Sequence, residues 1–237
     1  LSVSKDGVKA RSRSAAGALA PFGQLKLSAG LSETDFRGER FAHLPGQQRG
    51  NNDLLVLSRP EVIREIHTRY LEAGADIIET CTFNSQSISL ADYHCESLVK
   101  EINFAAAQLA RTCADNYATP EKPRFVAGSV GPTNKTCSLS PDVNDPALRT
   151  LHFDELAIAY QEQIEALLEG GVDAILIETV FDTLNAKAAV VAAQAAMSTK
   201  GREVPIMLSV TVADKGGRTL SGQTLEAFLA SFSTMPI

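Results

Sequence analysis

Two glutamates in this sequence directly follow short apolar runs, at the points where a strand would give way to a loop. Glu178 follows Ala174–Ile177, and a similar string, Gly-Ala-Asp-Ile-Ile-Glu-Thr, contains Glu79. We interpret the two as related positions in successive strand–helix units. The carboxyl end of a strand in a parallel barrel is where chemistry is placed. Both glutamates are therefore candidate substrate-binding residues, and capping the next helix or pairing with a Lys or Arg is the structural alternative.

Two further candidates lie at the start of a long polar loop. Thr133 and Asn134 follow Gly131-Pro132, and the loop that they open continues to Pro146. Long ordered loops in compact domains are usually functional. We therefore predict that Thr133 and Asn134 also contribute to substrate binding, with the alternative that they only shape the loop.

The cysteines and histidines show no spacing that is typical of a metal site. The four cysteines, Cys81, Cys95, Cys113 and Cys137, contain no C-x-x-C pair, and the histidines share no ligand spacing. Cys81 and Cys137 both fall in the loops predicted at the carboxyl-end rim of the strands, but two thiols make an incomplete site. The sequence thus predicts no metal ligands and no catalytic residue in this chain.

Alternating strands and helices are expected to position these candidates. Strands are predicted within 75–79, 125–130, 174–177 and 205–212, and helices at 58–73, 97–116 and 154–168, after 182 and from 225. Ser58 is the expected cap of its helix, with Pro60 in the first turn. The unbroken apolar run at 174–177 predicts a strand buried on both faces.

This alternation predicts parallel strands joined by right-handed crossovers. A doubly wound sheet is the alternative, but no G-x-G-x-x-G and no P-loop follows any strand. The polar strand ends favour a (β/α)₈ TIM barrel with outer helices. Such a barrel takes about 250 residues, so this chain of 237 residues, with four clear strands, is expected to be a partial barrel.

Composition narrows the classes of partner. A net charge of −6 and a pI near 5.3 argue against a nucleic acid or an anionic membrane surface. No apolar run approaches the ~20 residues of a membrane span, and no secretory signal opens the chain, so a cytoplasmic location is expected. Residues 1–30, rich in Ser, Ala, Gly, Lys and Arg, are expected to be irregular or disordered, and 31–237 to form the domain.

Seven strings, spread over residues 31–230, together resemble the homocysteine-binding module of cobalamin-dependent methionine synthases. They are Phe36–Glu39, Gly50–Leu54, Gly74–Thr80, Gly131–Asn134, Ser140–Pro146, Ile177–Lys187 and Gly217–Thr224. Their common order along the chain makes the resemblance specific. The loop Ser140–Pro146 and the turn Gly50–Leu54 fit the cobalamin enzyme better than relatives that use betaine or S-methylmethionine.

The resemblance implies a (β/α)₈ barrel in which zinc, held by three cysteine thiolates, binds the homocysteine sulfur and presents it to methylcobalamin. Metal coordination would remove the proton of a thiol whose ordinary pKa is near 8.5. Glu178 matches the family position that binds the ammonium group of the substrate. The implied cofactors of a parent enzyme are zinc and cobalamin, and the implied partners are homocysteine and separate cobalamin- and folate-binding modules.

The chain also departs from the family pattern. The family opens with a strand that ends Asp-Gly-Gly-Met-Gly-Thr, and its zinc cysteines lie in Asn-Cys-Ala and Gly-Gly-Cys-Cys-Gly strings, none of which occurs here. Cys81 stands where the family usually has Asn. Measured against this family, we therefore expect a piece of the module, a partial barrel incomplete at both ends, that binds no zinc or cobalamin of its own and is inactive alone.

Other functions remain open at this point. One is a homocysteine methyltransferase that uses another methyl donor, and another is a barrel enzyme acting on a phosphorylated substrate. A third is a non-catalytic truncated product, whose unpaired strand edges would favour self-association.

Overall fold

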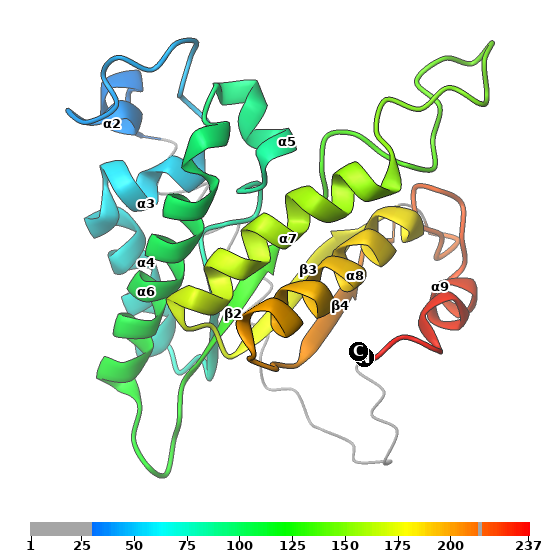
Figure 1. The fold of residues 1–237 in the computed structure, drawn as a ribbon. Helices are drawn as coiled ribbons and strands as arrows, with labels where there is room; N and C mark the ends of the chain where they lie inside the picture. The colour runs from blue at the N-terminus through cyan, green and yellow to red at the C-terminus, as the bar shows by residue number, and fades with distance from the viewer. Residues whose placement is uncertain (1–29, 213–214) are drawn as a thin grey trace.

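The computed structural model describes residues 30–212 and 215–237. The strands are β1 (Ile77–Glu79), β2 (Phe125–Val130), β3 (Ala174–Val180) and β4 (Ile206–Val210). The helices are α2 (Glu33–Arg37), α3 (Leu55–Ser58), α4 (Pro60–Glu72), α5 (Ser87–Leu90), α6 (Val99–Tyr117), α7 (Phe153–Gly170), α8 (Thr183–Lys200) and α9 (Leu225–Phe232), with short 3₁₀ turns at 52–54, 91–93 and 96–98 (Figure 1). The prediction of an irregular segment at 1–30 lies outside the described residues, except for Gly30.

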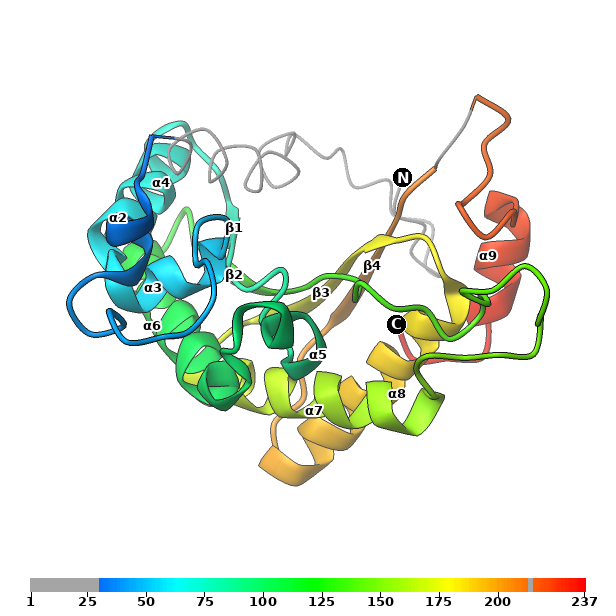
Figure 2. The same cartoon turned by 90° about the horizontal axis from the view of Figure 1, so that it is seen from above.

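The four strands form one parallel sheet in the order β1-β2-β3-β4. Helices α6, α7 and α8 connect successive strands, and Figure 2 shows them along one face of the curved sheet. Over the described residues the sheet does not close, because β1 and β4 each pair with a single neighbour. The chain is therefore a partial (β/α)₈ barrel, which confirms the predicted fold class.

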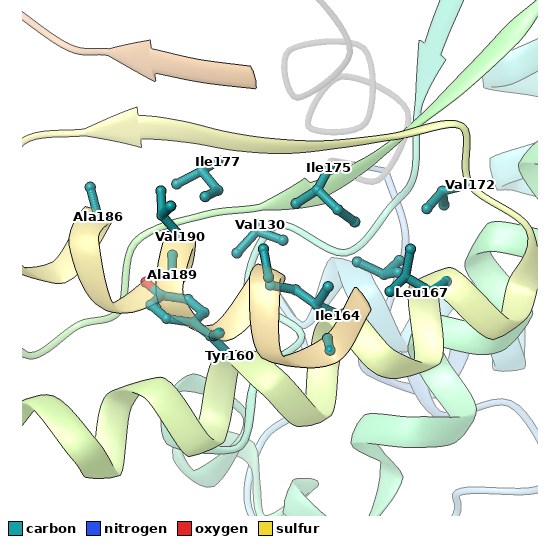
Figure 3. Packing of buried hydrophobic residues seen from close by; sticks show 14 of the residues in the cluster. Val130, Tyr160, Ile164, Leu167, Val172, Ile175, Ile177, Ala186, Ala189 and Val190 are labelled. Carbon is teal, nitrogen blue, oxygen red and sulfur yellow. The ribbon is translucent and has the colours of Figure 1, made fainter. Parts of the chain in front are cut away.

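The main core lies between the sheet and helices α7 and α8. Figure 3 shows side chains from both layers meeting there, with Val130, Ile175 and Ile177 from the sheet and Tyr160, Ile164, Leu167, Ala186, Ala189 and Val190 from the helices. Burying each larger apolar side chain contributes about 1.5–3 kcal/mol. None of the helices in the described residues is long and apolar enough to cross a membrane.

The opposite face of the sheet, here called the inner face, is less covered. On β3, Ile175 and Ile177 are buried against the helices, whereas Leu176 and Glu178 point the other way and are only half buried. The prediction that this strand is buried on both faces is therefore wrong.

The predicted cap of α4 is also wrong. Ser58 is the last residue of the separate short helix α3, and its hydroxyl donates to the Leu54 carbonyl. Arg59 occupies the N-cap position without a side-chain cap. The prediction that Pro60 lies in the first turn is confirmed. A serine that completes one helical turn cannot also adopt the extended backbone that a cap requires.

The two repeated strings prove to belong to alternate units rather than successive ones. The first leads into β1 and the second into β3, with β2 between them. Their shared glycines, Gly74 and Gly171, both follow a helix and have φ near +99° and +98°, a conformation that glycine adopts without strain. The following aspartates also match, because Asp76 pairs with Arg124 and Asp173 with Arg111. The repeated string therefore corresponds to the same helix-to-strand turn, used before β1 and again before β3.

Candidate substrate-binding site

Three neighbouring strands bring polar side chains together on the inner face. Glu79 ends β1, Ser129 lies near the end of β2, and Glu178 lies in β3. Side chains alternate between the two faces of a strand, and the pairing of Glu79 with Ala127 and of Ser129 with Leu176 places all three on the inner face. The two glutamates predicted from sequence therefore belong to one site, with Ser129 from the intervening strand between them.

The strand that carries Glu178 does not end at it, as the sequence pattern suggested. β3 continues to Val180, and its register with β4 shifts between Ile177 and Val180. Thr179 has a φ of +57°, which is unusual for a β-branched residue. Glu178 therefore sits immediately before a strained, bulge-like irregularity of the kind that redirects side chains beside functional sites.

The Ser129 hydroxyl donates to Glu178 Oε1 at 2.5 Å. Two threonines from the chain after β1 hold the Ser129 backbone: its N–H donates to Thr80 Oγ1 at 2.9 Å, and its carbonyl accepts from Thr82 Oγ1 at 2.7 Å. The two threonine hydroxyls lie 2.6 Å apart. Since the Thr82 proton is used on the carbonyl, Thr80 must donate to Thr82. This set of contacts fixes the position from which Ser129 reaches Glu178.

Both carboxyl groups are held in conditions that disfavour their charge. Only 7% of Glu79 is exposed, and burial, followed by the charge of Glu178, raises the pKa of Glu79 to about 8. Burial also raises the pKa of Glu178, and the Ser129 hydrogen bond opposes that rise. Over residues 30–212 and 215–237, no Lys, Arg or His forms an ion pair with either glutamate. The pair is therefore suited to a positively charged ligand group.

Thr133 and Asn134 take part in a different set of contacts. The buried Thr133 hydroxyl donates to the Lys135 carbonyl and accepts from Asn185 Nδ2 at 3.2 Å. Asn134 Nδ2 donates to the exposed carboxylate of Asp92 at 2.7 Å. Neither residue forms a hydrogen bond with Glu79 or Glu178. Both shape the loop after β2, and their predicted role in substrate binding stays a prediction.

Helix α8 anchors that loop beside the site. Asp182 caps α8 by accepting from the Leu184 and Asn185 amides, and it also accepts from the Ser138 hydroxyl at 2.6 Å. Asn185 Oδ1 accepts from the Cys137 amide at 2.8 Å. Gly131 permits the close approach of the loop, because a Cβ there would lie 2.4 Å from the Phe83 carbonyl oxygen. The loop is therefore fixed on one side of Glu178.

A small cavity lies where this loop, α7 and β3 meet. Gly131, Pro132, Tyr160, Ile177 and Glu178 are among its lining residues, and its volume of about 10 Å³ suits about one water molecule. An amino acid would not fit in it. The cavity is therefore too small to be the substrate site itself.

Ser129 is the site residue that sequence reasoning missed. It lies inside the apolar string Phe125–Val130, where a small hydroxyl gives no pattern of its own. The available signal was alternation: Ser129 follows Ala127 by two residues and therefore shares its face. Without the order of the strands, that signal could not show which side chain Ser129 would meet.

The cysteines do not fit the metal site that the resemblance implies. All four are buried and free, and they come from four different segments. Cys81 donates to the Asn52 carbonyl at 3.4 Å, and burial raises the pKa of the thiols of both Cys81 and Cys137. The described residues contain no group of three or more His, Cys, Asp or Glu that could hold a metal ion. These donors do not make a zinc site, and the expectation that the chain binds no zinc stays a prediction.

Comparison with protein families gives one match over most of the chain. The family model described as homocysteine S-methyltransferase matches residues 23–237.

Solved structures show a similar fold. The metallated form of the homocysteine methyltransferase MmuM from Escherichia coli has a TM-score of 0.64 and 21% identity, over 86% of this chain and 68% of that one. The oxidized form of the same enzyme has a TM-score of 0.62 and 22% identity, over 77% of this chain and 61% of that one. The apo form has a TM-score of 0.57 and 24% identity, over 78% of this chain and 61% of that one. This chain thus spans 61–68% of the length of those structures, and at such identities the likeness shows the fold alone.

Proposed function

Because the chain belongs to the homocysteine S-methyltransferase family, we propose that it is the homocysteine-binding portion of a methionine synthase. Such an enzyme transfers a methyl group from methylcobalamin, and ultimately from methyltetrahydrofolate, to the homocysteine sulfur. The seven sequence strings support this choice within the family. The methyl donor is the part of the proposal that rests on the strings alone.

The arrangement of Glu79, Ser129 and Glu178 is the observation that carries the proposal. Homocysteine has an ammonium group, and a partly buried carboxylate without a cationic partner gains most from such a ligand. Glu178 is the better placed of the two acids, because Ser129 stabilises its charge and orients it. We propose that Glu178 binds the ammonium group directly and that Glu79 adds to the negative field.

The chain's own residues account for binding rather than for methyl transfer. A thiol with an ordinary pKa is mostly protonated at neutral pH, and the described residues offer no set of metal ligands to change this. We therefore propose that this chain is inactive alone. Zinc and cobalamin, and the modules that bind cobalamin and folate, would belong to the remainder of a parent enzyme in the cytoplasm.

A non-catalytic truncated product is the alternative that the metal misfit favours. It predicts the same fold without affinity for homocysteine. A homocysteine methyltransferase with a different donor would keep the affinity and would not respond to cobalamin.

The test is to titrate the purified chain with L-homocysteine and with 4-mercaptobutyric acid, which lacks the amino group. Binding is followed by NMR shifts or calorimetry. A charge-assisted hydrogen bond is worth about 1.5–3 kcal/mol, so Glu178→Gln should weaken homocysteine binding by about 10–100-fold. The same substitution should leave the weak binding of 4-mercaptobutyric acid unchanged.

Glu121→Gln is the matched control, because Glu121 is exposed in the loop before β2. It should bind homocysteine as the wild type does. Equal affinities of wild type and Glu178→Gln for homocysteine would overturn the proposed role of Glu178. No binding of homocysteine to the folded wild-type chain would favour the truncated product.

A further inference from the structure

Among the described residues, no positive charge compensates the buried Glu79 carboxyl group. It lies on the inner face with 7% exposure and has no ion pair or hydrogen bond among the contacts of the described residues. Within the part of the chain that the structure describes, the titratable groups that interact electrostatically with it are Glu178 from β3 and Tyr70 from α4. Neither supplies a positive charge. A carboxylate in such a position is neutralised by a proton unless a cation arrives.

The hydrogen bonds make the two acids unequal. Ser129 donates to Glu178 Oε1, so the ionised form of Glu178 has a donor that Glu79 lacks. Thr80 and Thr82 hold Ser129 in place for this contact. When two interacting acids share one proton, it resides mainly on the acid whose charge is less stabilised. In this pair that acid is Glu79.

We propose that Glu79 and Glu178 together hold a single proton, carried by Glu79, and that the ammonium group of the bound amino acid expels it to solvent. In the free chain Glu79 is neutral and Glu178 carries the charge. In the complex both are carboxylates beside one ammonium group, and one proton has left. This deepens the proposed function and rests on it, because it makes amino-acid binding an exchange of one cation for another.

The exchange predicts a defined pH dependence. Burial and Glu178 raise the pKa of Glu79 to about 8, and the ammonium group of a free amino acid remains charged below that pH. Each bound ligand should therefore release about one proton near neutral pH. By linkage, the association constant should rise about tenfold from pH 6 to pH 7.

Methionine is the probe for this test, because it has the ammonium group and no thiol proton that could be released. Calorimetry in buffers of different ionisation heat counts the protons released on binding. The wild type and Glu121→Gln should release about one proton per methionine bound. Glu79→Gln should bind methionine with no proton release and with the same affinity at pH 6 and pH 7.

A second measurement needs no ligand. A ¹³C NMR titration of the glutamate carboxyl groups should show one resonance that titrates well above the ordinary range and disappears in Glu79→Gln. Methionine binding without proton release, or a Glu79 resonance that titrates near 4.5, would overturn the proposal and leave homocysteine binding intact. If methionine and homocysteine both fail to bind, the proposed function fails, and the carboxyl titration still decides whether the proton is shared.

Discussion

Replacing Ser129 with alanine tests the central contact of the site. The substitution removes one hydroxyl, which donates to Glu178 Oε1 at 2.5 Å, and leaves the backbone bonds to Thr80 and Thr82 in place. Ser129 is 2% exposed, so the change creates only a small void. The fold should persist, and the effect should appear in the ionisation of Glu178.

The size of the effect follows from the lost hydrogen bond. A hydrogen bond to a charged group contributes about 1.5–3 kcal/mol, and about 1.4 kcal/mol corresponds to a tenfold change in affinity. The contact favours the charged form, so its removal should raise the pKa of Glu178 further. Burial already raises that pKa, so Glu178 should carry less charge near neutral pH. Homocysteine binding at pH 7 should weaken by about tenfold or more.

The assay is a ¹³C NMR titration of glutamate carboxyl groups, with homocysteine affinity measured on the same samples. Ser97→Ala is the control, because Ser97 is exposed in the 3₁₀ turn at 96–98, outside the sheet that carries the glutamates. It should change neither the titration nor the affinity. An unchanged Glu178 titration in a folded Ser129→Ala chain would refute the role assigned to this hydroxyl.

Three further predictions follow. The folded-state pKa of Glu79 is raised above its ordinary value to about 8, so its contribution to stability is present below pH 4.5 and is lost as pH rises through 8. In urea unfolding, the free energy of unfolding of Glu79→Gln should therefore rise relative to that of the wild type by about 1–3 kcal/mol between pH 5 and pH 8. Free energies of unfolding that change in parallel with pH in the two proteins would contradict this prediction. Gly170→Ala should destabilise the chain by about 1–3 kcal/mol, because the new Cβ would lie 2.5 Å from Ala107 Cβ in α6. Gly30→Ala is the control, because a Cβ at Gly30 would have open space around it. Equal unfolding midpoints of the two variants would show that the helices adjust to the added methyl group. Metal analysis after dialysis should find well under one zinc per chain, and stoichiometric zinc accompanied by homocysteine binding would show that the chain builds a site from other donors.

The sequence by itself determined the kind of fold and much of its layout. Phe125–Val130 was predicted residue for residue as a strand, and the observed α7 and α9 begin within one residue of their predicted starts. These features follow from local patterns: apolar period, caps and helix-ending glycines act over a few residues and are visible in one string. The two glutamates were found for the same reason, since each directly follows an apolar run.

Only the tertiary structure decided which side chains meet. Ser129 could be placed beside Glu178 only once β2 was known to lie between β1 and β3, and a shift of one residue in register would turn either side chain to the helix-covered face. The extension of β3 past Glu178 and the half-exposed inner face likewise depend on pairing with β4 and on the strands that do not close the sheet. Thr133 and Asn134 are instead bonded to Asn185 and Asp92, which lie 52 and 42 residues away from them in sequence. Such contacts are set by the packing of distant segments, and a local pattern cannot encode them.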